Sequence, residues 1–85
     1  MISVITIAKN EEKTIERTIL SVTNQSAINE IEYIVIDGKS SDNTLEIIKK
    51  YKNKISKIIS EADFGIYNAM NKGIKAAKGE YILFL

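Results

Sequence analysis

The fold of this chain is decided by the stretch Ile31–Thr44, which reads IEYIVIDGKSSDNT. Its first half is apolar up to Asp37, and the run Ile34-Val35-Ile36 would be apolar on both faces of a strand. Runs of this kind are typical of a parallel strand that helices cover on both sides. The second half is a polar turn, and Asn43 with Glu46, three residues further on, predicts the capped start of a helix.

The same alternation extends toward the N-terminus. Ile2–Ile7 is apolar and β-branched, which predicts a first strand. We expect Asn10 to cap the helix that follows, with Glu11 and Glu12 at the positive end of its dipole. One face of that helix would carry the apolar residues Ile15, Ile19 and Val22.

The alternation also extends toward the C-terminus. The second helix would present an inner face of Leu45, Ile48 and Tyr51, and Ile55–Ser60 predicts a short third strand. A third helix is expected from about Ile66 to Ala77, with Gly79 at the position of a C-terminal cap. Its apolar stripe would consist of Ile66, Met70, Ile74 and Ala77. Residues 80–85 predict a fourth strand, in which the chain stops, as expected of a fragment.

The order βαβαβαβ predicts an α/β fold with a parallel sheet and right-handed crossovers. We expect a three-layer, Rossmann-like arrangement with strand order 3-2-1-4 and helices on both faces of the sheet. In such a sheet, ligands bind beyond the carboxyl ends of the strands, where the strand order reverses. We call the edge formed by these carboxyl ends the rim of the sheet. The segments expected there are Ala8–Glu11, Asp37–Lys39 and whatever follows Leu85.

The composition limits the chemistry. The chain of 85 residues is 45% hydrophobic with a net charge of +1, and it has no Cys and no His. Disulfides and thiolate metal sites are therefore excluded. Any general acid or base would have to be an Asp, Glu, Lys or Tyr side chain. With 7% aromatic residues and no clustered basic block, a nucleic-acid surface is not supported.

The apolar runs are too short to span a bilayer, and the N-terminus lacks the basic start of a secretory signal. We therefore expect a cytoplasmic protein, with the cytoplasmic face of the membrane as an alternative for the full-length protein.

Three residues carry two interpretations each. Asp37 could accept hydrogen bonds from a base or a ribose hydroxyl, or it could cap the turn that follows it. Asn71 and Lys72 could face a phosphate or a sugar, or they could be solvated positions of a closely packed helix.

Gly38-Lys39-Ser40 is similar to the end of a P-loop, but that pattern requires Gly where this chain has Tyr33.

Four segments, in order, resemble glycosyltransferase family 2. They are Ala8–Glu12, Val35–Thr44, Ser60–Gly73 and Lys78–Leu85. The third is the closest match, and it resembles a subgroup that makes bacterial surface polysaccharides. No single motif is decisive, but the ordered set covers the whole chain and is specific.

The resemblance implies that residues 1–85 are the N-terminal, nucleotide-sugar-binding part of a glycosyltransferase domain with a GT-A fold. It implies that the turn after the first strand, Ala8 with Lys9 and Glu11, packs on the nucleobase, and that Asp37 contacts the base or ribose. The family's Asp-x-Asp motif, which binds Mg²⁺ or Mn²⁺, would follow Leu85, as would the catalytic carboxylate. No metal is expected on this segment alone.

The activity implied is inverting transfer of a sugar from a nucleotide donor to a saccharide or lipid-linked acceptor, and the fragment alone is expected to be inactive. Three positions depart from the family pattern. Many members have a second acid at Gly38, an aromatic residue at Lys9 and a Pro at Ile7. Stacking on the base, and the identity of the base, therefore stay open.

Two alternatives belong to other functional classes. A non-catalytic nucleotide-binding or interaction module would share the same fold. A signalling receiver domain would need an acidic pair after the first strand, where this chain has Ala8-Lys9-Asn10, so it fits poorly. The unfinished sheet of the fragment leaves the fourth strand or its neighbour as an open edge, which predicts self-association.

Overall fold

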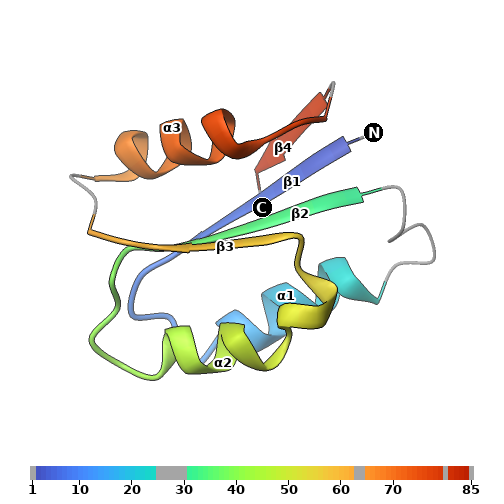
Figure 1. The fold of residues 1–85 in the computed structure, drawn as a ribbon. Coiled ribbons are helices and arrows are strands. Elements are labelled where there is room, and N and C mark those ends of the chain that lie inside the picture. Colours follow the sequence, from blue (N-terminus) through green and yellow to red (C-terminus); the bar gives the residue numbers. More distant parts are fainter. Residues whose placement is uncertain (1, 25–30, 63–64, 80, 85) are drawn as a thin grey trace.

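A computed structural model describes residues 2–24, 31–62, 65–79 and 81–84, with the backbone alone at residues 66, 67 and 81. Strands and helices alternate along the chain (Figure 1). Their bounds are β1 Ile2–Ala8, α1 Ile15–Thr23, β2 Ile31–Asp37, α2 Thr44–Lys50, the 3₁₀ helix η2 Lys52–Lys54, β3 Lys57–Ser60, α3 Ile66–Ala76 and β4 Tyr81–Phe84.

The four described strands form one parallel sheet in the order β3-β2-β1-β4. In Figure 1, α1 and α2 lie on one face of the sheet and α3 lies on the other. The predicted parallel sheet, strand order and three-layer arrangement are therefore confirmed. β1 is a central strand, paired with β2 over seven residues and with β4 over four.

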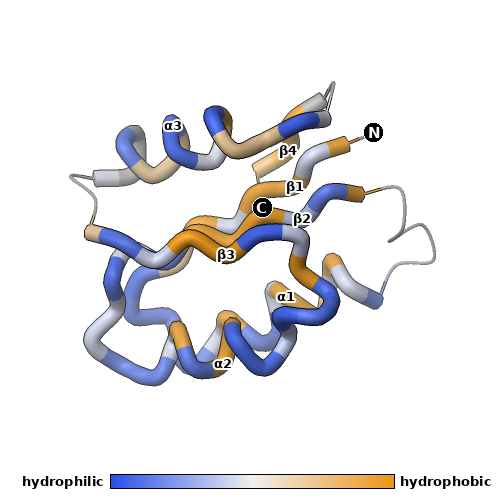
Figure 2. Tube along the Cα trace, in the orientation of Figure 1, coloured by the Kyte–Doolittle hydropathy of each residue, from blue (hydrophilic) through white to orange (hydrophobic). Residues whose placement is uncertain are grey.

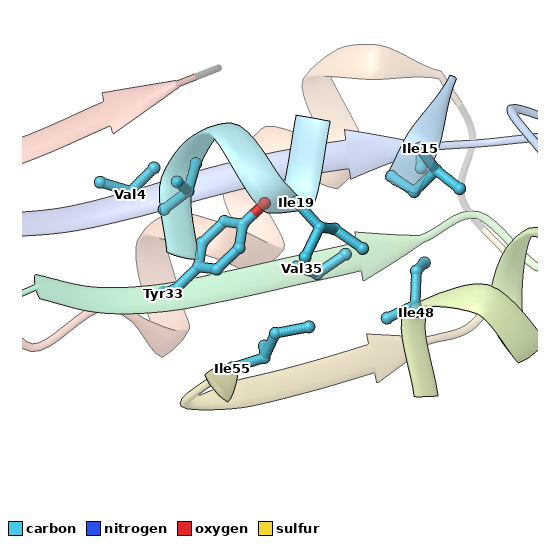
Figure 3. Close-up of a cluster of buried hydrophobic side chains, with 9 residues drawn as sticks. Val4, Ile15, Ile19, Tyr33, Val35, Ile48 and Ile55 are labelled. Atoms are coloured by element: carbon cyan, nitrogen blue, oxygen red, sulfur yellow. The ribbon is translucent and has the colours of Figure 1, made fainter. Parts of the chain in front are cut away.

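The face covered by α1 and α2 has a core of large side chains (Figure 3). Ile15, Ile19 and Val22 are spaced four and three residues apart, so they share one side of α1, and all three are buried. They pack with residues of β1, β2 and α2 and with the residue after η2, namely Val4, Ala8, Tyr33, Val35, Ile48 and Ile55. Figure 2 shows this pattern as apolar strands beside helices that are largely hydrophilic.

The face covered by α3 is packed through small residues. Ala69 is fully buried against Ile5, Ile34 and Ile36, and Ala76 and Ala77 pack beside them. The predicted stripe of α3 is wrong at Ile74, whose side chain is 46% exposed. The side chain of Ile66, also predicted in that stripe, lies outside the described residues.

The reason for this rotation of α3 is Gly73, which lies directly on the sheet. A Cβ at this position would be 2.8 Å from Ile5 Cγ2 and 3.1 Å from Ile36 Cδ1. Only a residue without a side chain allows such close contact, so the helix turns Gly73 inward and Ile74 outward.

Two predicted helix caps are wrong. Asn10 does not cap α1: the N-cap residue is Thr14, and Asn10 lies in the preceding turn with a left-handed backbone, φ 54°. Gly79 does not cap α3, which ends at Ala76 with Ala77 as the C-cap. Asn43 is the N-cap residue of α2, as predicted, but its side chain makes no capping hydrogen bond.

The amino ends of β1 and β2 are joined to the turn before β4. Glu32 Oε1 accepts hydrogen bonds from Ser3 Oγ at 2.8 Å and from the Lys78 backbone N–H at 2.7 Å. Ser3 Oγ in turn accepts from the Gly79 N–H at 2.9 Å. Gly79 therefore helps to position β4 instead of ending a helix.

No helix in the described ranges has the length and apolar character that crossing a bilayer requires.

Candidate functional site

The carboxyl ends of three neighbouring strands form a row of residues at one rim of the sheet. Ala8 pairs in register with Asp37, and Asp37 pairs with Ser60. The backbone ladder continues one step further, because the Gly38 N–H donates to Ala8 O at 2.9 Å and the Glu61 N–H donates to Asp37 O at 3.1 Å. The segments that follow β1, β2 and β3 therefore begin side by side at this rim.

Asp37 is fully buried in this row, with 0% exposure. Its Oδ2 accepts from the Ser40 N–H at 3.1 Å and from Ser60 Oγ at 2.9 Å, and its Oδ1 accepts from Ser40 Oγ. A carboxylate offers about four acceptor sites, so these three bonds leave about one free. Of the two interpretations of Asp37, the structure shows the capping of its own turn.

The turn after β1 is bonded to the turn after β2 at Asn10. The Asn10 N–H donates to Ser40 Oγ at 2.9 Å, while Asn10 Oδ1 accepts from the Ser41 N–H at 2.9 Å and from Ser41 Oγ at 3.3 Å. Since Ser40 Oγ also donates to Asp37, a continuous chain of hydrogen bonds connects the first turn to the buried carboxylate.

A second connection between the two turns runs through Thr44. The Glu11 N–H donates to Thr44 Oγ1 at 2.8 Å, and Thr44 Oγ1 donates to Asp42 Oδ1. The Glu12 N–H donates to Asp42 Oδ2 at 3.3 Å, and Glu12 Oε2 accepts from the Asn43 N–H at 3.3 Å. The two turns are thus joined by reciprocal bonds between residues about 30 positions apart.

These bonds also set the charge state at the rim. The hydrogen bond from the Thr44 hydroxyl, with those from the Thr44 and Glu12 backbone N–H groups, lowers the pKa of Asp42 below its ordinary value. Hydrogen bonding to the charged form of a carboxyl favours that form. Asp42 is therefore ionised at neutral pH and keeps accepting from both turns.

The predicted residues Ala8, Lys9, Glu11 and Asp37 come together at this rim. Ala8 is buried at the end of β1, whereas Lys9 and Glu11 follow it with exposed side chains. A small hollow of about 100 Å³ lies on the α1 side, lined by Ala8 and Glu11 together with Thr6, Ile7, Thr14, Ile15 and Thr18.

Asn71 and Lys72 form a second group, on α3 at the opposite face of the sheet. Lys72 Nζ donates to Ala62 O at 2.7 Å and pairs with Glu61 Oε1 at 3.3 Å, so it holds the loop that leaves β3 at the rim. Asn71 is exposed beside it. Both line an open hollow of about 530 Å³ with Glu61, Asn68, Ile74 and Lys75.

A divalent cation does not fit the side chains of the described residues. No group of three or more acidic, His or Cys side chains in residues 2–24, 31–62, 65–79 and 81–84 converges as a metal site would require. The ligands that the family resemblance implies are therefore not found in this part of the chain.

Sequence reasoning missed the residues that organise the rim. Asn10, Ser40, Asp42 and Thr44 take part in the bonds between the two turns, and Ser60 bonds to Asp37 on the neighbouring strand. The available signal was the density of short polar side chains directly after β1 and β2, because such side chains bond readily to backbone groups.

The sequence model of one protein family, described as Glycosyl transferase family 2, matches residues 3–85. An uncharacterized glycosyltransferase of Mycobacterium tuberculosis is 40% identical over 84 residues, which cover 99% of this chain and 32% of that protein. The poly(ribitol-phosphate) beta-N-acetylglucosaminyltransferase TarS of Staphylococcus aureus is 36% identical over 87 residues, covering 98% of this chain and 15% of TarS. The chain therefore spans about a third or less of these relatives.

Two solved structures share the fold. The crystal structure of S. aureus TarS 1–349 in complex with UDP-GlcNAc matches with a TM-score of 0.89 and 34% identity, over 99% of this chain and 25% of that one. The mannosyltransferase PcManGT of Pyrobaculum calidifontis, in complex with GDP-Man and Mn²⁺, matches with a TM-score of 0.86 over 95% of this chain and 25% of that one. At 23% identity the second shows the fold alone. The predicted half of a GT-A fold is confirmed.

Proposed function

Because the chain belongs to glycosyl transferase family 2, we propose that it forms the donor-binding part of an enzyme that transfers a sugar from a nucleoside diphosphate sugar. The observation that carries the proposal is the rim at which Ala8, Asp37 and Ser60 end in register. In open parallel sheets, ligands bind beyond such a rim at the point where the strand order reverses. In the order β3-β2-β1-β4, this point lies between β1 and β4.

The proposed donor is a uridine diphosphate sugar. TarS, at 34% identity, was solved with UDP-GlcNAc, which supports this class of ligand. Ala8, Lys9 and Glu11 would pack beside the base. Asp37 is fully buried, so it would act toward the base or the ribose through Ser40, the turn residue that it holds. Lys72, whose ammonium group pairs with Glu61 in this structure, would turn its positive charge toward the diphosphate, and Asn71 beside it would offer amide donors.

The proposed acceptor is a saccharide or a lipid-linked saccharide of a bacterial surface polymer. A relative named poly-beta-1,6-N-acetyl-D-glucosamine synthase, from Staphylococcus epidermidis, supports a saccharide acceptor. We further propose a cytoplasmic enzyme that works at the cytoplasmic face of the membrane, where a lipid-linked acceptor would be anchored. Cell fractionation tests this point, and activity confined to the outside of the cell would contradict it.

The proposed reaction inverts the anomeric carbon. The acceptor hydroxyl loses its proton to a general base, its oxygen attacks the anomeric carbon, and the bond to the nucleoside diphosphate breaks. We assign the general base, and the ligands of the Mg²⁺ or Mn²⁺ used by the full-length enzyme, to segments outside the described residues. The described residues would bind and orient the donor.

The test is calorimetry of the full-length protein with UDP, GDP and dTDP, with and without Mn²⁺, beside a turnover assay with UDP-sugars. We expect UDP to bind most tightly and the full-length protein to turn over a UDP-sugar. Binding without turnover by any donor would favour a non-catalytic nucleotide-binding module. Residues 1–85 alone should bind UDP weakly and transfer no sugar, and turnover by this segment would refute the assigned division of labour.

We also propose that residues 1–85, when isolated, self-associate through the edge of β4. In the described part of the chain β4 pairs only with β1, and its Ile82 and Leu83 are 40% and 51% exposed. An exposed apolar edge strand is a template for pairing with another chain. Light scattering of this segment should show an oligomer, and a monomer at high concentration would contradict the proposal.

A further inference from the structure

The turn Lys9–Glu11 is shaped mainly by residues that would not touch the donor. We propose that Asn10 and Thr44 are positioning residues, which hold this turn in the conformation that nucleotide binding requires. The inference rests on the proposed donor site and adds to it two residues that act through their neighbours.

The first step is the backbone of Asn10. Its φ of 54° lies in the left-handed region, where residues other than Gly are uncommon and Asn and Asp are the most tolerated. This conformation sets the direction of Glu11 relative to Lys9, which follows β1 directly. Both residues are exposed, so burial does not fix them, and Glu11 Oε2 accepts one local bond, from Thr14 Oγ1 at 3.1 Å.

The second step is the side chain of Asn10. Its Oδ1 acts only as an acceptor in this network, taking the N–H of Ser41 and the Ser41 hydroxyl. Its backbone N–H reaches Asp37 through Ser40 Oγ. The position of the first turn is therefore coupled to the buried carboxylate at the end of β2.

The third step is Thr44, which is fully buried at the start of α2. Its hydroxyl is used twice, as the acceptor for the Glu11 N–H and as the donor to Asp42. Only a hydroxyl can fill both roles at this place, because the Thr44 oxygen lies between a donor and a carboxylate. Ser would keep both bonds, whereas Val would keep the shape and lose both.

These bonds bear on binding because they pre-order exposed turns. Beyond the bond from Gly38 to Ala8, the described backbone–backbone bonds do not join the two turns. Backbone bonds from the Thr14 and Ile15 N–H groups to Glu11 O hold only the end of the turn next to α1. Without the side-chain bonds, the part at Lys9 and Asn10 would have to be ordered when the donor binds, and that ordering weakens affinity. A positioning role therefore predicts a higher Kd and KM for the donor.

The test is a pair of substitution series in the full-length protein, with UDP as the calorimetric probe. Asn10→Asp keeps the acceptor and the left-handed backbone, so UDP should bind within about twofold of wild type. Asn10→Gly keeps only the backbone and should bind several-fold more weakly. Asn10→Ala loses both and should bind about tenfold or more weakly.

In the second series, Thr44→Val should raise the Kd for UDP about tenfold, and Thr44→Ser should restore it. Thr23→Val is the matched control, since the buried Thr23 Oγ1 has no hydrogen-bond partner among the described residues. It removes the same hydroxyl without removing a bond, and it should bind UDP as wild type does. Steady-state kinetics should show the loss in the KM for the donor more than in kcat.

The outcomes separate the two proposals. If the wild type binds none of UDP, GDP and dTDP, the proposed donor site fails. If the wild type binds UDP but Asn10→Ala and Thr44→Val bind it equally well, the positioning role alone is overturned. Equal losses in Asn10→Asp and Asn10→Ala would also overturn it, because the acceptor would then be irrelevant.

Discussion

The two ends of β2 each carry a carboxylate, and the two carboxylates are used in different ways. Asp37 at the carboxyl end is fully buried and bonds within its own turn and to Ser60 on the neighbouring strand. Glu32 at the amino end is half-buried and bonds to Ser3 and to the Lys78 backbone, 46 positions away. The carboxyl end of β2 therefore orders exposed turns, and its amino end holds the segment just before β4.

This contrast shows how one strand serves two purposes. The carboxyl end is followed by the short polar residues 40–44, which bond to the turn after β1. The amino end has one carboxylate that receives the chain just before β4. A change at Asp37 should therefore affect both stability and donor binding, whereas a change at Glu32 should affect stability alone.

The largest effect is expected from Asp37→Ala. The substitution leaves three donors, from Ser40 and Ser60, without their charged acceptor, and it should lower the free energy of unfolding by about 3 kcal/mol. Denaturant unfolding of the full-length protein measures this, and Asp37→Asn, which keeps one oxygen acceptor, should lose less. A loss under about 0.5 kcal/mol in Asp37→Ala would show that the rim tolerates unpaired donors.

A smaller effect is expected in the middle of β2. Tyr33 OH and Thr6 Oγ1 form a buried hydrogen bond of 2.8 Å, and burial raises the pKa of Tyr33 despite this bond. Tyr33→Phe leaves Thr6 unpaired and should cost about 1.5 kcal/mol of unfolding free energy. Adding Thr6→Val removes the second partner as well, so the double variant should recover part of the loss. A double variant that is less stable by the sum of both losses would contradict this.

Glu32→Ala should cost about 1 kcal/mol, because it removes the acceptor for Ser3 and Lys78 at a site where water can partly replace it. Unlike Asp37→Ala, it should leave the Kd for UDP within about twofold of wild type. Parallel unfolding and calorimetry measure the two effects. A strong loss of UDP binding would remove the distinction between the two ends of β2.

The smallest effect is a pH dependence at Glu32. The hydrogen bond from the Lys78 N–H, aided by Ser3 and by the charges of Lys78 and Lys57, lowers the pKa of Glu32 below its ordinary value of 4.5. A lowered folded-state pKa contributes stability above 4.5 that is lost as the pH falls through the folded-state value. Glu32→Gln keeps an oxygen acceptor but cannot titrate.

Thermal unfolding of wild type and Glu32→Gln across pH 3 to 7 should therefore show a small advantage for wild type near neutrality that shrinks below about pH 4.5. The pKa of Asp42 is lowered in the same direction, so Glu32→Gln should keep some of the acid sensitivity. An advantage that grows as the pH falls would contradict the assigned sign.

Most of the architecture was predictable because it depends on local patterns. The continuous apolar run Ile34-Val35-Ile36 predicted a strand covered on both faces, and Ile15, Ile19 and Val22 predicted the buried side of α1. Side-chain periodicity determines which residues can share a face, whatever the rest of the chain does.

The rest depended on contacts between distant residues. Asn10 bonds to Ser41, 31 positions away, so its local preference for a helix cap was overridden. α3 turned Ile74 outward because Gly73 allows closer contact with Ile5 than a stripe of larger side chains would. The roles of Ala8, Lys9, Glu11, Asp37, Asn71 and Lys72 toward a donor stay predictions.

The central position of β1 has a consequence for synthesis. β1 is synthesised before both of its partners, since β2 and β4 begin roughly 30 and roughly 80 residues later in the chain. At a translation rate of about 5 to 20 residues per second, one edge of this apolar strand stays unpaired for about 4 to 16 seconds before β4 is synthesised. During translation that edge can pair with another nascent chain. Slow codons between β2 and β4 should therefore lower the soluble yield of the protein.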